Sequence, residues 1–209
     1  MPDGPRTGWW ARLPVEGEPG SPAQRMLAAV LGDAFPAGSV VDLPDGRLPG
    51  GWQLLVRADA AGDRVRSVQV AMPTAPLLWY VELPEPAAAP PATTLVAFSD
   101  ARFADGTLLT AAEARRAGVR GEEQVAALRW WTGPGLVHQV YVGPAARRRG
   151  VGTKLVQVAY GVQHARGGTP LHGDGRRTDD GEAWSRALPA HAAWRVAERT
   201  ERLPSMTPA

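Results

Sequence analysis

Apolar and polar positions alternate over several short stretches of this chain, and such a two-residue period is typical of half-buried β-strands. Val, Leu, Thr and Trp recur in these stretches, while Gly, Pro and Asp stand between them. We therefore predict a protein built mainly on strands. The predicted strands are 52–57, 64–71, 77–83, 93–98, 124–131 and 136–142, with a shorter one at 170–173.

Near the N-terminus the spacing of apolar residues instead favours a helix. Ser21 and Pro22 suit the cap and the first position of a helix. The apolar residues that follow, up to about Phe35, then form its stripe: Met26, Leu27, Val30 and Leu31. Residues 1–20, which include the pair Trp9-Trp10, are predicted to be an irregular and exposed lead-in, and residues 38–51 are rich in turn formers.

Three further helices are predicted in the second half of the chain. Thr110 and Glu113 have the spacing of a capping box that opens a short helix ending at Gly118. A final helix over 179–188 has Asp179 as its candidate cap. Between them, a long helix begins after Arg148, with an apolar stripe formed by Val151, Leu155, Val158, Ala159 and Val162.

The segment 84–91 contains only Pro, Ala and Glu and is the clearest candidate boundary in the chain. It divides the sequence into an N-terminal α+β region (1–91), a core (92–190) and a C-terminal tail (191–209). The N-terminal region either stands by itself or completes the sheet of the core. The fold class predicted for the chain is α/β, with a mixed, mostly antiparallel sheet flanked by helices.

Composition limits the functions that the chain can have. A hydrophobic content of 44% and a charged content of 21% are those of a soluble globular protein. The absence of cysteine excludes disulfides, a thiol nucleophile and thiolate metal sites. A net charge of +2 gives no general argument for nucleic acid. The sequence has no secretory leader pattern and no long apolar run, so we expect a cytoplasmic protein that does not contact membranes.

The strand 136–142 and the helix after it are joined by a turn suited to anions. Gly150 and Gly152 occupy the predicted first helical turn, where glycine costs roughly 1 kcal/mol relative to alanine. Glycine lets a ligand approach the backbone, and the unpaired amides and dipole of a helix N-terminus attract negative charge. The adjacent Arg147, Arg148 and Arg149 add guanidinium groups that suit phosphate. This turn therefore predicts a polyphosphate site, most simply for a diphosphate.

The pattern Arg147-x-x-Gly150-x-Gly152, after Val142-x-Pro144 and before Leu155, resembles the acyl-CoA-binding motif of the GNAT superfamily of N-acetyltransferases. The resemblance implies a GNAT-like fold and acetyl-CoA as acyl donor. It implies backbone contacts of Val140 and Val142 with the pantetheine arm, and the backbone of Tyr141 or Val142 as donor to the thioester oxygen. The residues implied for the diphosphate are Arg147, Arg148, Arg149, Gly150, Val151, Gly152 and Thr153. An ordinary strand–helix unit with a basic cap remains the alternative.

Transfer of an acyl group to an amine needs a base for the amine, and an acid can protonate the departing thiolate. His138 is the candidate base, because imidazole titrates near neutral pH and related enzymes have a histidine at this strand position. By the two-residue period it should lie on the same strand face as Val140 and Val142. A histidine packed between sheet and helix is the structural alternative. Glu122 and Glu123 are the nearest acidic candidates.

The candidate acid is Tyr160 on the long helix, because the final helix contains Trp184 and no tyrosine. Solvent is the alternative proton donor. A loop cluster after 170–173 could bind the acceptor or the nucleotide of CoA, or could be solvated: His172, Asp174, Arg176 and Arg177. His172 and Asp174 are too few for a metal site, so no metal is predicted. Trp79, Trp130 and Trp131 line an acceptor pocket or fill the core.

The sequence thus predicts an acyl-CoA-dependent N-acyltransferase, most simply an N-acetyltransferase, that acts on a primary amine. Direct attack is expected because no cysteine can carry the acyl group. A small amine, a protein amine and an aminoacyl-tRNA remain open as acceptors, and tRNA is the one nucleic acid retained as a partner. A homodimer also remains open. The alternative function is a non-catalytic GNAT-like binding or assembly module.

Overall fold

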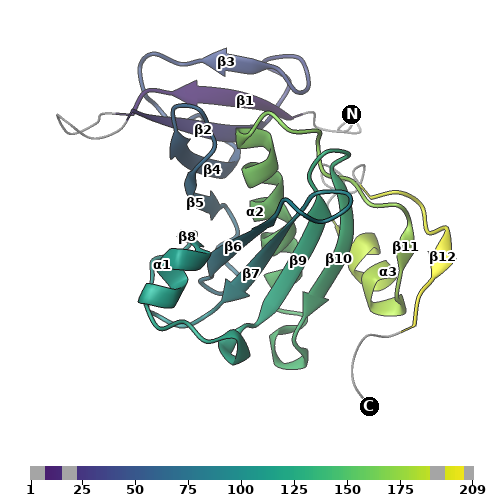
Figure 1. The fold of residues 1–209 in the computed structure, drawn as a ribbon. Helices are drawn as coiled ribbons and strands as arrows, with labels where there is room; N and C mark the ends of the chain where they lie inside the picture. Colours follow the sequence, from purple (N-terminus) through teal and green to yellow (C-terminus); the bar gives the residue numbers. More distant parts are fainter. Residues whose placement is uncertain (1–7, 16–22, 189–195, 205–209) are drawn as a thin grey trace.

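Two five-stranded sheets flank one long helix, α2 (Val151–Ala165), in the computed structural model, which describes residues 8–15, 23–188 and 196–204 (Figure 1). The first sheet has the order β3-β1-β2-β4-β5 and the second β10-β9-β7-β6-β8. Neighbouring strands are antiparallel except β1 with β3 and β6 with β8. The protein is therefore α/β, with two mixed, mostly antiparallel sheets and few helices.

The first sheet consists of β1 (Gly8–Leu13), β2 (Gln24–Leu31), β3 (Val40–Asp42), β4 (Trp52–Asp59) and β5 (Val65–Val70). The second consists of β6 (Trp79–Glu85), β7 (Ala92–Phe98), β8 (Leu108–Thr110), β9 (Ala126–Trp131) and β10 (Leu136–Val142). The smaller elements are α1 (Ala111–Arg116), α3 (Asp179–Arg186), two 3-10 turns (Gly121–Glu123 and Pro144–Ala146) and the pair β11 (Arg176–Arg177) and β12 (Glu201–Arg202). Among the helices of the described residues, none is long and apolar enough to cross a bilayer.

The predicted apolar stripe holds α2 between the sheets, and the long helix is confirmed. The stripe residues are buried in one cluster with Val56 and Val68 of the first sheet and Leu128 and Trp130 of the second. Each fully buried Val or Leu contributes roughly 1.5–3 kcal/mol. A Cβ added at Gly161 would lie 3.0 Å from Val56 Cγ2, so the helix and β4 are in close contact at this glycine. The sides of α2 that face the sheets are therefore fixed by apolar packing.

The two sheets are joined at the turn predicted around Asp105-Gly106. Ser67 and Thr107 form an antiparallel bridge, and the Val68 N–H donates to the Gly106 carbonyl oxygen at 2.9 Å. Gly106 has φ +80°, and a Cβ there would lie 2.4 Å from Val68 O. Only glycine fits this position without displacing β5.

The N-terminal lead-in was predicted wrongly, because residues 8–13 form the internal strand β1. Trp9 and Trp10 are 5% and 3% exposed and lie in different apolar clusters. Trp10 stacks on His164 of α2, with ring centroids 3.7 Å apart. Each indole is covered because β1 lies between two strands and both of its faces are packed.

The helix predicted up to Phe35 is also wrong: residues 24–31 form β2, paired with β1 and β4. The predicted cap, Ser21-Pro22, lies outside the described residues. A short apolar run reads alike in a buried strand and in a helix, and here pairing on both edges decides for the strand. A short strand, β3, also occurs within the turn-rich stretch 38–51.

The predicted strands between 52 and 142 are confirmed, with ends shifted by up to two residues, and so is the Thr110–Glu113 capping box. The division at residue 91 does not separate two cores, because 86–91 joins β6 and β7 of the same sheet. The N-terminal region thus completes the second sheet and also forms the first. In the tail, β12 pairs in parallel with β11. The final helix has Thr178, not Asp179, as its N-cap.

Candidate functional site

The free edge of the second sheet opens into a cleft. Strand β10 meets the segment 170–173 at a single parallel bridge, Leu136 with His172. There the Val137 N–H donates to His172 O, and the His172 N–H donates to Gly135 O, both at 2.9 Å. No further bridge joins the two segments within the described part of the chain, so they separate beyond this point. The short strand predicted at 170–173 is thus reduced to one bridge.

The register of β10 decides which backbone groups face the cleft. Val137, Val140 and Val142 pair with Trp130, Leu128 and Ala126, which are alternate residues of β9. Alternate antiparallel pairs point their backbone groups the same way, and the Val137 N–H points away from β9 toward His172. The backbone groups of Val140 and Val142 therefore point into the cleft.

Tyr141 has the opposite backbone orientation. It pairs with Ala127, and the next residue of the same phase, Gly143, donates its N–H to Val125 O at 2.9 Å, on the β9 side. The Tyr141 amide therefore points toward β9 and is not a donor to the cleft. Two backbone donors were expected for a thioester oxygen, and of these the Val142 N–H points into the cleft whereas the Tyr141 N–H does not. The Val140 N–H has the same orientation as the Val142 N–H.

One cavity lies at the turn between β10 and α2, and we call it the turn cavity. It has a volume of about 390 Å³ and is lined by the end of β10, residues 146–148 and 150–153, and part of α3. Gly150 is the N-cap of α2, in the left-handed conformation at φ +79°, and no side chain caps the helix. The amides of the first turn thus face this cavity without a side-chain acceptor. An anion is the natural ligand for such a helix end.

The two glycines of the motif have different roles. A Cβ on Gly150 would lie 3.2 Å from the Ala75 Cβ, in addition to its positive φ, so the fold itself requires glycine there. A Cβ on Gly152 would lie 3.4 Å from Val142 Cγ2, which is an ordinary contact. The fold therefore does not demand glycine at 152. Because Gly152 has no side chain, its backbone stays accessible from the turn cavity.

The arginines of the turn are also unequal. Arg147 donates to Val142 O and to Asp180 Oδ2, both at 3.1 Å, and so ties β10 to α3. Arg148 is exposed and has φ +58°, a strained conformation for a residue with a side chain. Arg149 is exposed as well, and no carboxylate of the described residues lies within ion-pair distance of Arg148 or Arg149. Of these two residues, Arg148 lines the turn cavity and Arg149, a sequence candidate for the diphosphate, does not.

A second cavity continues along β10, and we call it the strand cavity. Its volume is about 220 Å³, and it lies between β10, α2, the segment 171–178 and α3. It shares five lining residues with the turn cavity: Val140, Thr153, Thr178, Gly181 and Trp184. The Trp184 Nε1 donates to Thr153 Oγ1 at 2.9 Å, which fixes α3 to α2 at the junction. The two cavities therefore lie next to each other along β10.

His138 lines the strand cavity, but not with the predicted orientation. A β-bulge between Val137 and Gln139 shifts the register at this residue. The His138 ring stacks on Trp131, with centroids 4.9 Å apart, whereas the neighbouring Trp130 faces α2. The prediction that His138 shares a face with Val140 and Val142 is therefore wrong. The alternative of a histidine packed between sheet and helix is also wrong, because His138 is exposed.

Tyr160 lies on the same cavity, on the opposite wall. It is half-buried on α2 and packs near Trp10, with ring centroids 5.8 Å apart. His172 lines the cavity from the segment across β10. Two imidazoles and one phenol thus come together from three elements.

The other sequence candidates lie elsewhere or have structural roles. Trp79 and Trp130 are fully buried core residues. Glu123 pairs with Arg102, and neither it nor Glu122 lines the cleft. Asp174 accepts a hydrogen bond from the Arg176 N–H, and the described residues contain no group of side chains that could hold a metal ion. Arg176 and Arg177 do line the strand cavity.

The sequence reasoning missed a second stripe on α2. Thr153, Val156, Gln157 and Tyr160 recur three and four residues apart and all line the strand cavity. This spacing is visible in the sequence. It was not recognised because the stripe mixes polar and apolar residues, unlike the buried stripe beside it.

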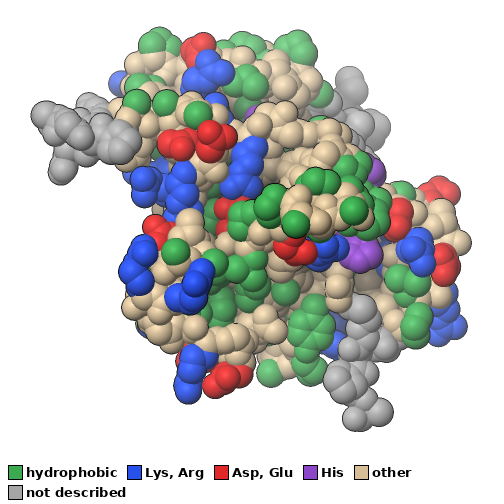
Figure 2. Space-filling view, in the orientation of Figure 1, with side chains coloured by type: hydrophobic (Ala, Val, Ile, Leu, Met, Phe, Trp, Pro, Cys, Tyr) green, Lys and Arg blue, Asp and Glu red, His purple; other side chains and the backbone are tan. Residues whose placement is uncertain are grey.

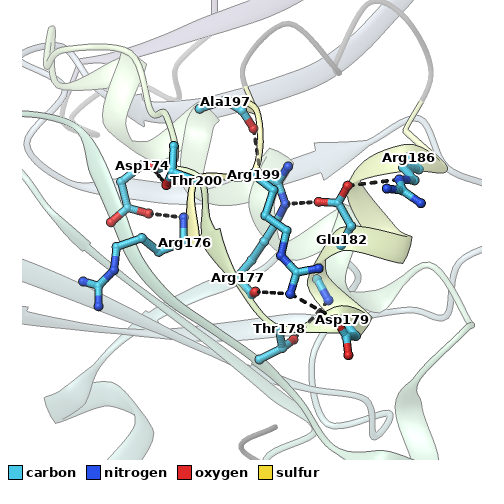
Figure 3. Close-up of polar contacts among 11 residues, drawn as sticks. Asp174, Arg176, Arg177, Thr178, Asp179, Glu182, Arg186, Ala197, Arg199 and Thr200 are labelled. Atoms are coloured by element: carbon cyan, nitrogen blue, oxygen red, sulfur yellow. Dashed lines mark hydrogen bonds and ion pairs between the residues drawn. The ribbon is translucent and has the colours of Figure 1, made fainter. Parts of the chain in front are cut away.

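The outer wall of the strand cavity includes the C-terminal segment 196–203, which is held by polar contacts (Figure 3). Arg177 donates to Ala197 O at 2.8 Å and Arg199 donates to Arg177 O at 3.0 Å. Asp179 pairs with Arg199 and Arg202, and Glu182 with Arg177 and Arg186. These contacts bring Val196 and Leu203 to the cavity.

The same pairs set the acidity of two carboxyl groups. Hydrogen bonds from Arg199 and Arg202 hold the pKa of Asp179 below its ordinary value. A hydrogen bond from Arg177, with a smaller contribution from Arg186, lowers the pKa of Glu182. Both carboxylates are therefore charged at neutral pH, and their ion pairs with the arginines are formed there.

Comparison with models of protein families, with curated proteins and with solved structures finds no match for this chain.

Proposed function

We propose that the cleft binds acyl-CoA and that the protein transfers the acyl group to a primary amine. The observation that carries the proposal is that a cavity at an uncapped helix N-terminus adjoins a cavity along the free backbone edge of β10. A diphosphate suits the first-turn amides together with Arg148, which lines the turn cavity. A pantetheine arm contains amides that can pair with a strand edge, as Val140 and Val142 offer.

The order of elements around the cleft supports the same proposal. Antiparallel strands β7, β9 and β10 lead into α2, and the segment after α2 returns to meet β10 in parallel before separating from it. This is the arrangement that a GNAT-like fold requires at its acyl-CoA site. Both charge signs are interspersed on the face seen in Figure 2, which gives no broad basic surface for nucleic acid there.

In the proposed reaction the amine nitrogen bonds to the thioester carbonyl carbon, the carbon–sulfur bond breaks and the sulfur leaves as thiolate. The nitrogen loses one proton to a base, for which His138 is the first candidate because it is exposed at the cavity. The Val140 or Val142 amide stabilises the developing oxyanion. Tyr160 or solvent supplies the proton that the thiolate takes.

Calorimetric titration with acetyl-CoA tests the binding step, and Arg148→Gly is the informative variant. Glycine adopts φ +58° without strain, so this change removes a guanidinium without a cost to the fold. We expect saturable binding by the native chain and a loss of roughly 10- to 100-fold in affinity in the variant, since a charge-assisted contact contributes roughly 1.5–3 kcal/mol. Arg115→Ala, an exposed arginine at the end of α1, is the matched control.

Dephospho-CoA should bind nearly as well as acetyl-CoA, because it retains the diphosphate, whereas pantetheine should bind far more weakly. Equal affinity of the native chain and Arg148→Gly for acetyl-CoA would remove the turn from the site. No binding at millimolar ligand would overturn the proposed function.

A non-catalytic binding module is the second candidate, and one observation favours it. None of the described residues that line the strand cavity is Asp or Glu, and the candidate base His138 is stacked on Trp131. His138→Ala decides between the two. For an enzyme we expect amine acetylation to fall by about 10²–10⁴-fold while acetyl-CoA affinity stays within twofold. Binding without turnover of any amine by the native chain would establish the module instead.

A further inference from the structure

The strand cavity has an apolar wall that the proposed chemistry does not use. Its lining includes Val137, Val140, Val156, Leu171, Leu188 and Trp184, with Val196 and Leu203 from the C-terminal segment. Val140 is 36% exposed although it lies in the centre of the cleft. Exposed apolar side chains that line a concave surface are typical of a site for an apolar ligand group.

The described lining of this cavity offers no partner that would hold a charged group. Its charged side chains are Arg176 and Arg177, which pair with Glu201 and Glu182, and it contains no carboxylate. An ammonium group held there would lose its hydration without gaining an ion pair, whereas the amine that attacks the thioester is neutral. A neutral hydrocarbon group does not meet this cost, so the occupant is apolar and uncharged.

The connection to the turn cavity identifies where this group comes from. The two cavities share their junction at Val140, Thr153 and Trp184, so a molecule anchored at the arginine turn extends along β10 into the strand cavity. We propose that the strand cavity takes the hydrocarbon chain of an acyl donor longer than acetyl. This inference rests on the proposed function and specifies its donor.

The C-terminal segment makes the size of the cavity adjustable. Val196 and Leu203 are carried by residues that ion pairs and a two-residue strand pairing hold to the loop 174–182 (Figure 3). At Gly175, φ is +82° and an added Cβ would lie 2.2 Å from Glu198 O, so the segment approaches the loop backbone directly. Leu203 lines the cavity from outside the buried core, so a change in the size of its side chain alters the space for the chain without a change to that core.

Calorimetric titration of the full chain with CoA, acetyl-CoA, butyryl-CoA and hexanoyl-CoA tests the inference. We expect affinity to rise with chain length by up to about fourfold for each methylene that enters the cavity, and at least tenfold from acetyl to hexanoyl. Leu203→Trp should abolish this gain while the affinity for CoA itself stays within twofold. Leu203→Ala should allow a longer optimal chain, and Leu48→Trp, at an exposed loop position, is the control.

The outcomes separate the two proposals. Binding of CoA with equal affinity for acetyl and hexanoyl thioesters overturns the inference and leaves the proposed function intact. A chain-length gain that survives in Leu203→Trp and is unchanged in Leu203→Ala also overturns it, because the chain then lies elsewhere. Failure of every compound to bind, CoA included, overturns both.

Discussion

The two sides of α2 are held in different ways. Toward the sheets, its valines and leucine are buried among apolar side chains, and the buried Lys154 donates to Pro76 O and Asp105 Oδ1 at 2.9 and 2.7 Å. Toward the cleft, α3 and the segment 196–203 are held mainly by arginine–carboxylate pairs and by the Trp184–Thr153 hydrogen bond.

The apolar side of α2 therefore contributes to the stability of the fold, whereas the elements on its cleft side can move. Apolar packing fixes the direction of α2 and thereby the position of its N-terminus, whether or not a ligand is bound. Ion pairs with an exposed partner, such as those of Asp179 with Arg199 and Arg202, contribute little to global stability, so the segment 196–203 can move at small cost. The predictions below test this contrast.

Leu155→Ala should have the largest effect on stability. Leu155 is fully buried in the core cluster, and such truncations cost about 2–5 kcal/mol in the free energy of unfolding. Urea denaturation measures the loss. Val156→Ala, one residue further on the cleft side, is the matched control and should cost less than about 1 kcal/mol. Equal losses at the two positions would contradict the contrast between the two sides of the helix.

Lys154→Met should have an intermediate effect. It removes the chain's single lysine and leaves the Asp105 carboxylate and Pro76 O without their buried donor, at a cost of roughly 1–3 kcal/mol. Asp105 keeps its hydrogen bond from the Leu78 N–H, which limits the loss. The double variant with Asp105→Asn should recover part of it in the same urea assay. A double variant less stable than the sum of the single changes would show that the charge pair is not the cause.

Acid should release the C-terminal segment with the smallest effect on global stability. The pKa values of Asp179 and Glu182 are lowered in the folded protein, so their pairs stabilise the segment above the ordinary carboxyl range. This stabilisation begins to be lost as the pH falls below about 4, and it is fully lost once the pH is below the lowered pKa values of the two carboxyl groups. We expect the amide protection of β12, corrected for the intrinsic pH dependence of exchange, to fall between pH 6 and pH 3 while that of α2 persists.

Asp179→Asn should reproduce this release at neutral pH, with little change in the urea midpoint. It removes the charge that pairs with Arg199 and Arg202 of the segment without changing the size of the side chain. Loss of protection in α2 together with β12 would mean that the two sides of the helix unfold as one unit.

Elements specified by local pattern could be predicted from the sequence. The stripe of α2, the Thr110–Glu113 capping box and strand β10 depend on neighbouring residues, and the structure confirms each of them. The arginine–glycine turn was located for the same reason, although Gly150 precedes the helix and does not lie inside it.

Elements specified by distant partners could not be predicted. Residues 24–31 are a strand because β1 and β4 pair with both of their edges, and a local apolar run contains no information about that pairing. The orientation of His138 depends on a bulge relative to β9, which shifts the alternation by one residue.

The sequence by itself determined a strand–turn–helix unit with arginine and glycine at its turn, because strand, helix and turn preferences act locally. Only the tertiary structure decided what surrounds that unit. It packed α2 between two sheets, separated β10 from its parallel neighbour, and brought Leu203 to a cavity that Val137 and Val140 also line. These contacts join residues far apart in the chain, and they form because burial and pairing over the whole molecule outweigh local preference.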